Sequence, residues 1–128
     1  MSVMAEIRRR AAADSPLWAQ ALAPGEGPEP DFAGRCPATH LLGVEMIREG
    51  YLLHRGRSRL FRQDDQDLAL LTGDYLYAAG LVEICNTGDL DAVVALAELI
   101  SSSSRDLGEG DARSGERLWQ ETVGRLGR

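Results

Sequence analysis

The feature that most constrains the fold is a long apolar segment from Asp67 to Cys85. Apolar residues recur at helical spacing on two of its sides: Leu68, Leu71, Tyr75, Ala79 and Val82 on one, and Leu70, Tyr77, Leu81 and Ile84 on the other. A helix that is apolar on two sides is buried on two sides. Gly73 and Gly80 share one face of this helix, where a second backbone can approach closely. The segment therefore predicts a core helix that needs a large partner surface.

Five other segments carry helical signals: residues 3–13, 17–22 behind the cap Ser15-Pro16, 38–53, 90–102 and 114–126. Gly43 and Gly50 are expected to interrupt the third helix of the chain. Asn86-Thr87-Gly88-Asp89 combines a left-handed C-cap with an N-cap, which predicts that helices 67–85 and 90–102 form an antiparallel hairpin. No segment reads as a strand. We therefore predict an all-α, antiparallel helical bundle.

The chain divides into three regions by composition. Residues 1–23 form an N-terminal helical segment, and residues 38–128 form a helical core. Between them, residues 24–37 contain four prolines and three glycines, which excludes a helix or a central strand. We expect this stretch to be an extended linker, and whether it is ordered stays open.

Composition and charge exclude several classes of protein. The 128 residues include 20 acidic and 14 basic side chains, all of the latter arginine, for a net charge of -6. No positive field is available to hold nucleic acid. Neither an uninterrupted membrane-spanning run nor a signal peptide is expected, and Cys36 and Cys85 form no CxxC motif. We therefore predict a cytoplasmic protein that binds no nucleic acid and has no membrane span.

Two clusters of charge raise the question of ligand binding. Asp64, Asp65 and Asp67 are either a Mg²⁺ site or, as their place at a helix start favours, residues that cap that helix. The run Arg55, Arg57, Arg59 and Arg62 either directs several guanidinium groups at one phosphate or is a solvated loop that pairs with the nearby aspartates. His40 and His54 have no spacing typical of a zinc site.

Several stretches resemble the trans-isoprenyl diphosphate synthase (polyprenyl synthetase) family. They are Glu45-Met46-Ile47-Arg48-Glu49-Gly50-Tyr51-Leu52-Leu53-His54, Leu70-Leu71-Thr72-Gly73-Asp74-Tyr75-Leu76, Thr87-Gly88-Asp89, Arg105-Asp106-Leu107-Gly108-Glu109-Gly110-Asp111 and Glu116-Arg117-Leu118-Trp119. In that family a Glu…Leu-Ile-His helix leads into an Asp-Asp-x-x-Asp motif, and a later helix opens with Leu-x-Gly-Asp-x-Leu. The resemblance covers about residues 38–126 and implies the N-terminal half of the isoprenoid synthase fold.

The sequence departs from the family at the two aspartate-rich motifs that bind the catalytic metal ions. After His54 come Arg55 and Gly56 instead of two aspartates, and the second aspartate-rich motif is also missing. Ionisation of an allylic diphosphate needs divalent metals held by carboxylates on two facing helices. We therefore expect no catalytic residue, no bound metal and no cofactor in this chain, which would not be an enzyme on its own. Any Mg²⁺ would belong to a partner subunit.

The resemblance implies a small, non-catalytic subunit that stabilises a catalytic prenyl diphosphate synthase and tunes its product length. It places Gly50 and Tyr51 at a chain-length pocket, and makes Arg55 and Arg57 diphosphate contacts. It assigns the subunit interface to two helices, with the residues Gly73, Tyr75, Leu76, Tyr77, Gly80, Leu81, Ile84, Val93, Val94 and Ala97. For Tyr51 the alternative is an ordinary, half-buried core tyrosine.

Two other functions stay open at this point. The chain is either a stand-alone scaffold, which forms a homodimer through the same helices, or a pseudoenzyme that binds a prenyl diphosphate through Arg55 and Arg57.

Overall fold

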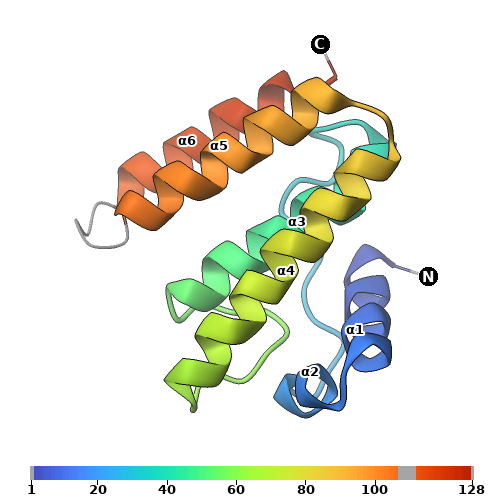
Figure 1. Cartoon of the computed structure of the whole chain (residues 1–128), viewed down its shortest axis with the longest axis vertical. Helices are drawn as coiled ribbons and strands as arrows, with labels where there is room; N and C mark the ends of the chain where they lie inside the picture. The colour runs from blue at the N-terminus through green and yellow to red at the C-terminus, as the bar shows by residue number, and fades with distance from the viewer. Residues whose placement is uncertain (1, 107–111, 128) are drawn as a thin grey trace.

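A computed structural model describes residues 2–106 and 112–127 of the chain. These residues form six helices, namely α1 Val3–Asp14, α2 Pro16–Ala21, α3 Ala38–His54, α4 Gln66–Asn86, α5 Leu90–Asp106 and α6 Ala112–Arg125 (Figure 1). Among the described residues, a single isolated bridge joins Leu22 to Phe61, and no longer strand forms. The all-α prediction and each predicted helix are confirmed. Most of the stretch 105–111, where one resemblance lies, is outside the described residues.

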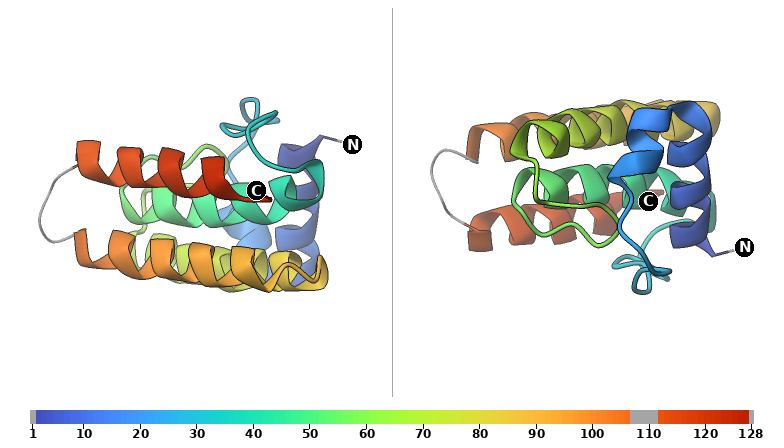
Figure 2. Two further views of the ribbon diagram at one scale, coloured as in Figure 1. Left: turned by 90° about the horizontal axis from the view of Figure 1, so that it is seen from above. Right: turned by 90° about the horizontal axis from the view of Figure 1, so that it is seen from below.

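The central helix is α3, which lies between α4 and α6 in both views of Figure 2. Every residue from Gly43 to Leu53 is buried. One group of core side chains joins α3 to α5 and α6 around Trp119, and a second group joins α3 to α1, α2 and α4. Because α3 is covered on all sides, its sequence lacks a clear apolar face.

The closest contact in the fold is between α3 and α4, which run antiparallel. Gly43 faces Gly80, and Gly50 faces Gly73. A Cβ atom on Gly80 would lie 2.8 Å from the carbonyl oxygen of Gly43, and one on Gly50 would lie 2.8 Å from that of Gly73. The predicted close approach at Gly73 and Gly80 is confirmed. The expected interruption of α3 is wrong, since Gly43 and Gly50 lie inside one continuous helix, where they provide the other half of this glycine seam.

The predicted hairpin of α4 and α5 needs a correction. The turn between them is as expected, with Gly88 at a φ of 82° and Asp89 accepting a hydrogen bond from the backbone N–H of Ala92. Beyond the turn the two helices diverge, and α5 packs against α6 as well as against α4 (Figure 1).

Part of the stretch 24–37 is anchored to α3. Phe32 is 1% exposed and stacks near Trp119 of α6, with ring centroids 5.8 Å apart. The backbone N–H groups of Asp31 and Phe32 both donate to the carboxylate of Glu45. The composition excluded regular structure correctly, but it carried no sign of this buried anchor.

By length and composition α4 could cross a membrane, with a mean hydropathy of 1.4 over its most apolar stretch. A core helix of a globular protein meets the same criterion, and α4 packs along α3 through the glycine seam. The absence of a membrane span stays a prediction.

Candidate functional site

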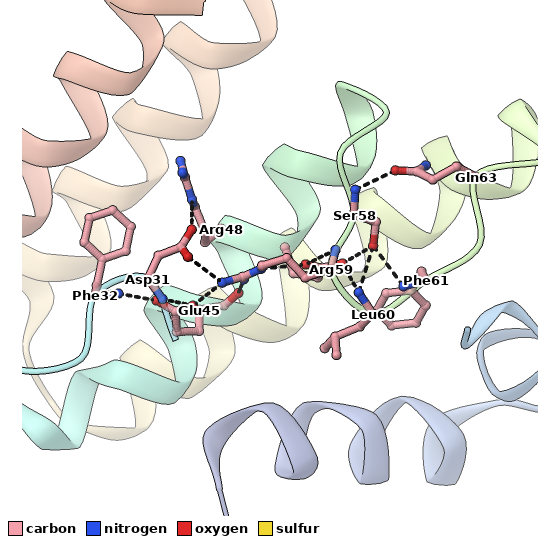
Figure 3. A network of polar contacts seen from close by, with 10 residues as sticks. Asp31, Phe32, Glu45, Arg48, Ser58, Arg59, Leu60, Phe61 and Gln63 are labelled. Carbon is pink, nitrogen blue, oxygen red and sulfur yellow. Dashed lines mark hydrogen bonds and ion pairs between the residues drawn. The ribbon is translucent and has the colours of Figure 1, made fainter. Parts of the chain in front are cut away.

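The arginine-rich loop after α3 is held by two buried glutamates, and Figure 3 shows one of them, Glu45, beside Arg59. Glu45 and Glu49 lie one helical turn apart on α3, and both are 0% exposed. Arg59 donates to both, with its Nη1 2.7 Å from Glu45 and its Nε 3.0 Å from Glu49. Burial lowers the pKa of Arg59, but the charges of Glu45 and Glu49 outweigh it, so the pKa is raised. Arg59 is therefore a structural cation and is not available to a ligand.

Backbone groups complete the same network. The hydroxyl of Ser58 and the N–H groups of Arg59 and Leu60 donate to Glu49. Arg48 joins in from the other side, donating from Nε to Asp31 at 2.9 Å and from Nη2 to Glu116 at 3.0 Å. This network fixes the loop, the 24–37 stretch and α6 against one face of α3.

The fixed loop forms one wall of an open hollow of about 550 Å³ at the C-terminal end of α3. Its lining residues come from the end of α3, the loop and the first turns of α4: Leu53, His54, Arg55, Gly56, Arg57, Gln63, Gln66, Ala69 and Leu70. We call this the arginine hollow. Its lining contains two guanidinium groups, two amides and an apolar floor, and no carboxylate.

The two arginines of the hollow differ in how firmly they are held. The guanidinium of Arg55 lies 4.4 Å from the centre of the Tyr51 ring and donates to the carbonyl of Ser103. The side chain of Arg57 is exposed. Nε2 of His54 lies 3.0 Å from the carbonyl oxygen of Leu70, to which it donates, and 3.3 Å from a carboxylate oxygen of Asp74. Arg57 is thus the freer cation of the site.

The structure separates the four arginines that the sequence grouped together. Arg55 and Arg57 share the hollow, Arg59 is buried on Glu45 and Glu49, and Arg62 lies exposed beside Asp64 and Asp65. Neither alternative for the run is therefore right as a whole. The partners of Arg59 are helix glutamates and not the neighbouring aspartates.

The aspartate cluster caps a helix, as the favoured alternative predicted. Asp65 accepts a hydrogen bond from the N–H of Leu68 and is the N-cap of α4, with Asp67 in the first turn. Among the residues that the structure describes, no group of three His, Cys, Asp or Glu side chains is arranged to hold a metal ion.

Neither residue of the implied chain-length pocket lines the arginine hollow. Gly50 belongs to the glycine seam, and Tyr51 is 2% exposed, 5.3 Å from the Trp119 ring between centroids. Tyr51 matches the core-tyrosine alternative, although it is buried and not half-buried, and a role in product length stays a prediction for it and for Gly50.

The residues assigned to a subunit interface fall into three groups. Gly73, Leu76, Tyr77, Gly80 and Ile84 are buried within the chain itself. Tyr75, Leu81 and Val93 are half-buried, and Tyr75 stacks on Trp18 at 4.9 Å. Val94 and Ala97 are exposed. A partner would therefore meet the opposite side of α4 from the one that carries the glycines.

That opposite side is apolar. On α4 it carries Leu71, Ala78, Val82 and Cys85, and on α5 the corresponding outward side carries Leu90, Val94 and Ala97; all seven side chains are exposed. We call this surface the α4–α5 face. Leu71, Val82, Leu90 and Val94 are each more than half exposed. The sequence pattern predicted that α4 is apolar on two sides, but not which of them α3 covers.

Comparison with models of known protein families, with curated proteins and with solved structures gives no match to this chain.

Proposed function

We propose that this chain is a non-catalytic subunit of a heteromeric prenyl diphosphate synthase, which binds the catalytic subunit through the α4–α5 face. The observation that carries the proposal is the exposed apolar surface of α4 and α5. Monomeric soluble proteins rarely leave a continuous apolar surface uncovered, and such a surface usually marks an interaction site. The partner is inferred from the resemblance in residues 38–126 to the prenyl diphosphate synthase family. The same resemblance implies that this chain has the N-terminal half of the isoprenoid synthase fold.

The missing carboxylates support a non-catalytic role. Where the family has its first metal-binding aspartates, this chain has Arg55 and Gly56, which line the arginine hollow. In the neighbouring acidic cluster, Asp65 is the N-cap of α4 and Asp67 lies in its first turn. A chain of this kind would contribute stability and shape to a complex, and its partner would supply the Mg²⁺ site.

The test is to mix the purified chain with the full-length prenyl diphosphate synthase of the same source. We expect the light-scattering mass of the mixture to equal that of a complex, and the product length or the rate to change. A chain that stays at 13.9 kDa beside an unaffected synthase would contradict the proposal. So would Mg²⁺-dependent prenyl transfer by the chain alone.

A second candidate function is supported by the arginine hollow, namely binding of a prenyl diphosphate by a pseudoenzyme. Guanidinium groups bind phosphate oxygens through paired hydrogen bonds, and the apolar floor of Leu53, Ala69 and Leu70 suits a hydrocarbon tail. Titration calorimetry with geranyl diphosphate tests it. We expect binding that Arg57→Ala weakens by about tenfold or more, with Arg62→Ala as the control outside the hollow. Absence of heat with the wild-type chain would reject this candidate.

A further inference from the structure

The α4–α5 face is bordered mainly by carboxylates, with Arg10 of α1 beside Ala78 and Val82 and Arg105 beside Val94. Asp67 and Asp74 lie seven residues apart along α4, and Asp91 and Glu98 lie seven apart along α5. Asp74 follows Leu71 by three residues and precedes Ala78 by four, so it projects beside the apolar stripe. Glu98 lines the same shallow surface as Val94, Ala97 and Arg105. These four carboxylates form the acidic rim of the face.

The acidic rim is not neutralised by the rest of the described chain. Its four residues are all exposed, and none pairs with an arginine among the described residues. Asp74 has His54 within 3.3 Å but is itself 70% exposed. The helix α4 contains no basic residue. Among the described residues, the cations at the edge of the face are Arg105, near the end of α5, and Arg10 of α1, which is paired with Glu6 and Glu83.

These charges discriminate between occupants of the face. Two copies of this chain, joined face to face, would bring two acidic rims together as the apolar side chains are covered. Like charges brought together in this way oppose association, and at physiological ionic strength salt largely screens only those charges that lie more than about 8 Å apart. A surface with basic side chains at its rim would gain attraction from the same approach.

We infer that the α4–α5 face binds a different chain, whose docking surface is apolar at its centre and carries arginine or lysine at its rim. This inference rests on the proposed function for the use of the face, and it adds the chemistry of the partner. It selects the heteromer over the homodimer, because the acidic rim disfavours a second copy of the same chain.

In the experiment, a charge-reversed variant of this protein takes the place of the unidentified partner. The double variant Asp74→Arg/Glu98→Arg keeps the apolar face and reverses the charge of its rim. Both substituted positions are exposed and lie within helices, away from the first turn. Sedimentation velocity is then measured on the wild-type chain, on the double variant, and on an equal mixture, each at low and at high salt.

We expect the wild-type chain to sediment as a monomer at low salt, and the mixture to form a dimer. Raising the salt should weaken the mixed dimer by about tenfold or more, because its specificity is electrostatic. Val82→Glu in the wild-type partner should abolish the mixed dimer, since Val82 is 58% exposed within the α4–α5 face. Leu17→Glu, at an exposed leucine of α2, should leave it intact.

A wild-type dimer that Val82→Glu dissociates would overturn the inference in favour of a second copy. A mixture that stays monomeric would overturn it as well. If the mixture stays monomeric but the wild-type chain still binds the synthase, the partner does not have a basic rim, and the proposed function is not contradicted. If the mixed dimer forms but the synthase does not bind the wild-type chain, the synthase is not the partner. The inferred preference of the face for a basic rim would then still hold.

Discussion

At the scale of single residues, the fold depends most on Arg59. Its guanidinium is the common cation for Glu45 and Glu49, which are both fully buried, and it lies 3.4 Å from Asp31. Removal of one member of a buried ion-pair network leaves uncompensated charge in the interior, which typically costs about 3–5 kcal/mol. We expect Arg59→Met to lower the free energy of unfolding by about that amount in a urea titration.

The matched control is Arg62→Met, at an exposed arginine of the same loop, which should change stability by less than about 0.5 kcal/mol. Adding Glu45→Gln and Glu49→Gln to Arg59→Met should recover some of the loss, because the unpaired charges are then gone. Equal stability of Arg59→Met and the wild-type chain would contradict the account of the network.

The two cysteines should differ in reactivity. Burial raises the pKa of the Cys36 thiol to about 11, and the charge of Glu45 acts in the same direction. Cys85 is exposed on α4. Since the thiolate is the nucleophile, alkylation of Cys36 in a Cys85→Ser variant should still be rising between pH 9 and pH 10, by about tenfold per unit. A rate for Cys36 that rises less than about twofold between pH 9 and pH 10, as for a free thiol, would contradict the stated pKa.

Residue roles could be predicted from the sequence only where they are local. The caps Asp65 and Asp89 act on N–H groups three residues away, so their position before an apolar run was enough to identify them. Arg59 meets Glu45 across 14 residues and a loop. No local pattern encodes that distance, and Glu45 and Glu49 resemble ordinary surface residues of a helix.

At the scale of elements, the pairing of α3 with α4 depends on glycines. A Cβ atom on Gly80 would lie 2.6 Å from a side-chain carbon of Ile47 and 2.8 Å from the carbonyl oxygen of Gly43. The backbone must then move apart, so Gly80→Ala should destabilise the protein by about 1–3 kcal/mol, despite the better helix propensity of alanine. Thermal unfolding followed by circular dichroism measures this.

Gly124 provides the matched control in α6. A Cβ atom there would meet nothing within 4 Å, so Gly124→Ala should stabilise the protein by up to about 1 kcal/mol. If Gly80→Ala raised the melting temperature as Gly124→Ala does, the two helices would not be in the close contact described.

The helices themselves were predictable, but their packing was only partly so. Caps, glycines and apolar spacing place all six helices within a few residues. Gly73 and Gly80 predict that another helix approaches α4 closely, but they do not predict which helix it is. Gly43 and Gly50 have the same spacing of seven residues, and this match is the signal that could have identified α3 as the partner. Phe32 gave no signal, because a single aromatic residue among prolines is compatible with solvent.

At the scale of the whole molecule, the fold covers one side of α4 and leaves the other bare. The core is organised around α3, with α4 and α5 along one side of the molecule and α6 along the other (Figure 2). Two-sided apolar character was visible in the sequence. The division between a buried side and the α4–α5 face depends on where α3 and α5 lie, which only the three-dimensional arrangement gives.

The central claim is that the α4–α5 face binds a catalytic synthase subunit. The most direct test is the mass of complexes formed by the full-length synthase with the double variant Val82→Glu/Val94→Glu, compared with the wild-type chain and Leu17→Glu. Both substituted valines are more than half exposed, so the variant should fold with unchanged circular dichroism. We predict that the wild-type chain and Leu17→Glu bind the synthase and that the double variant does not. Equal binding by the double variant would contradict the claim.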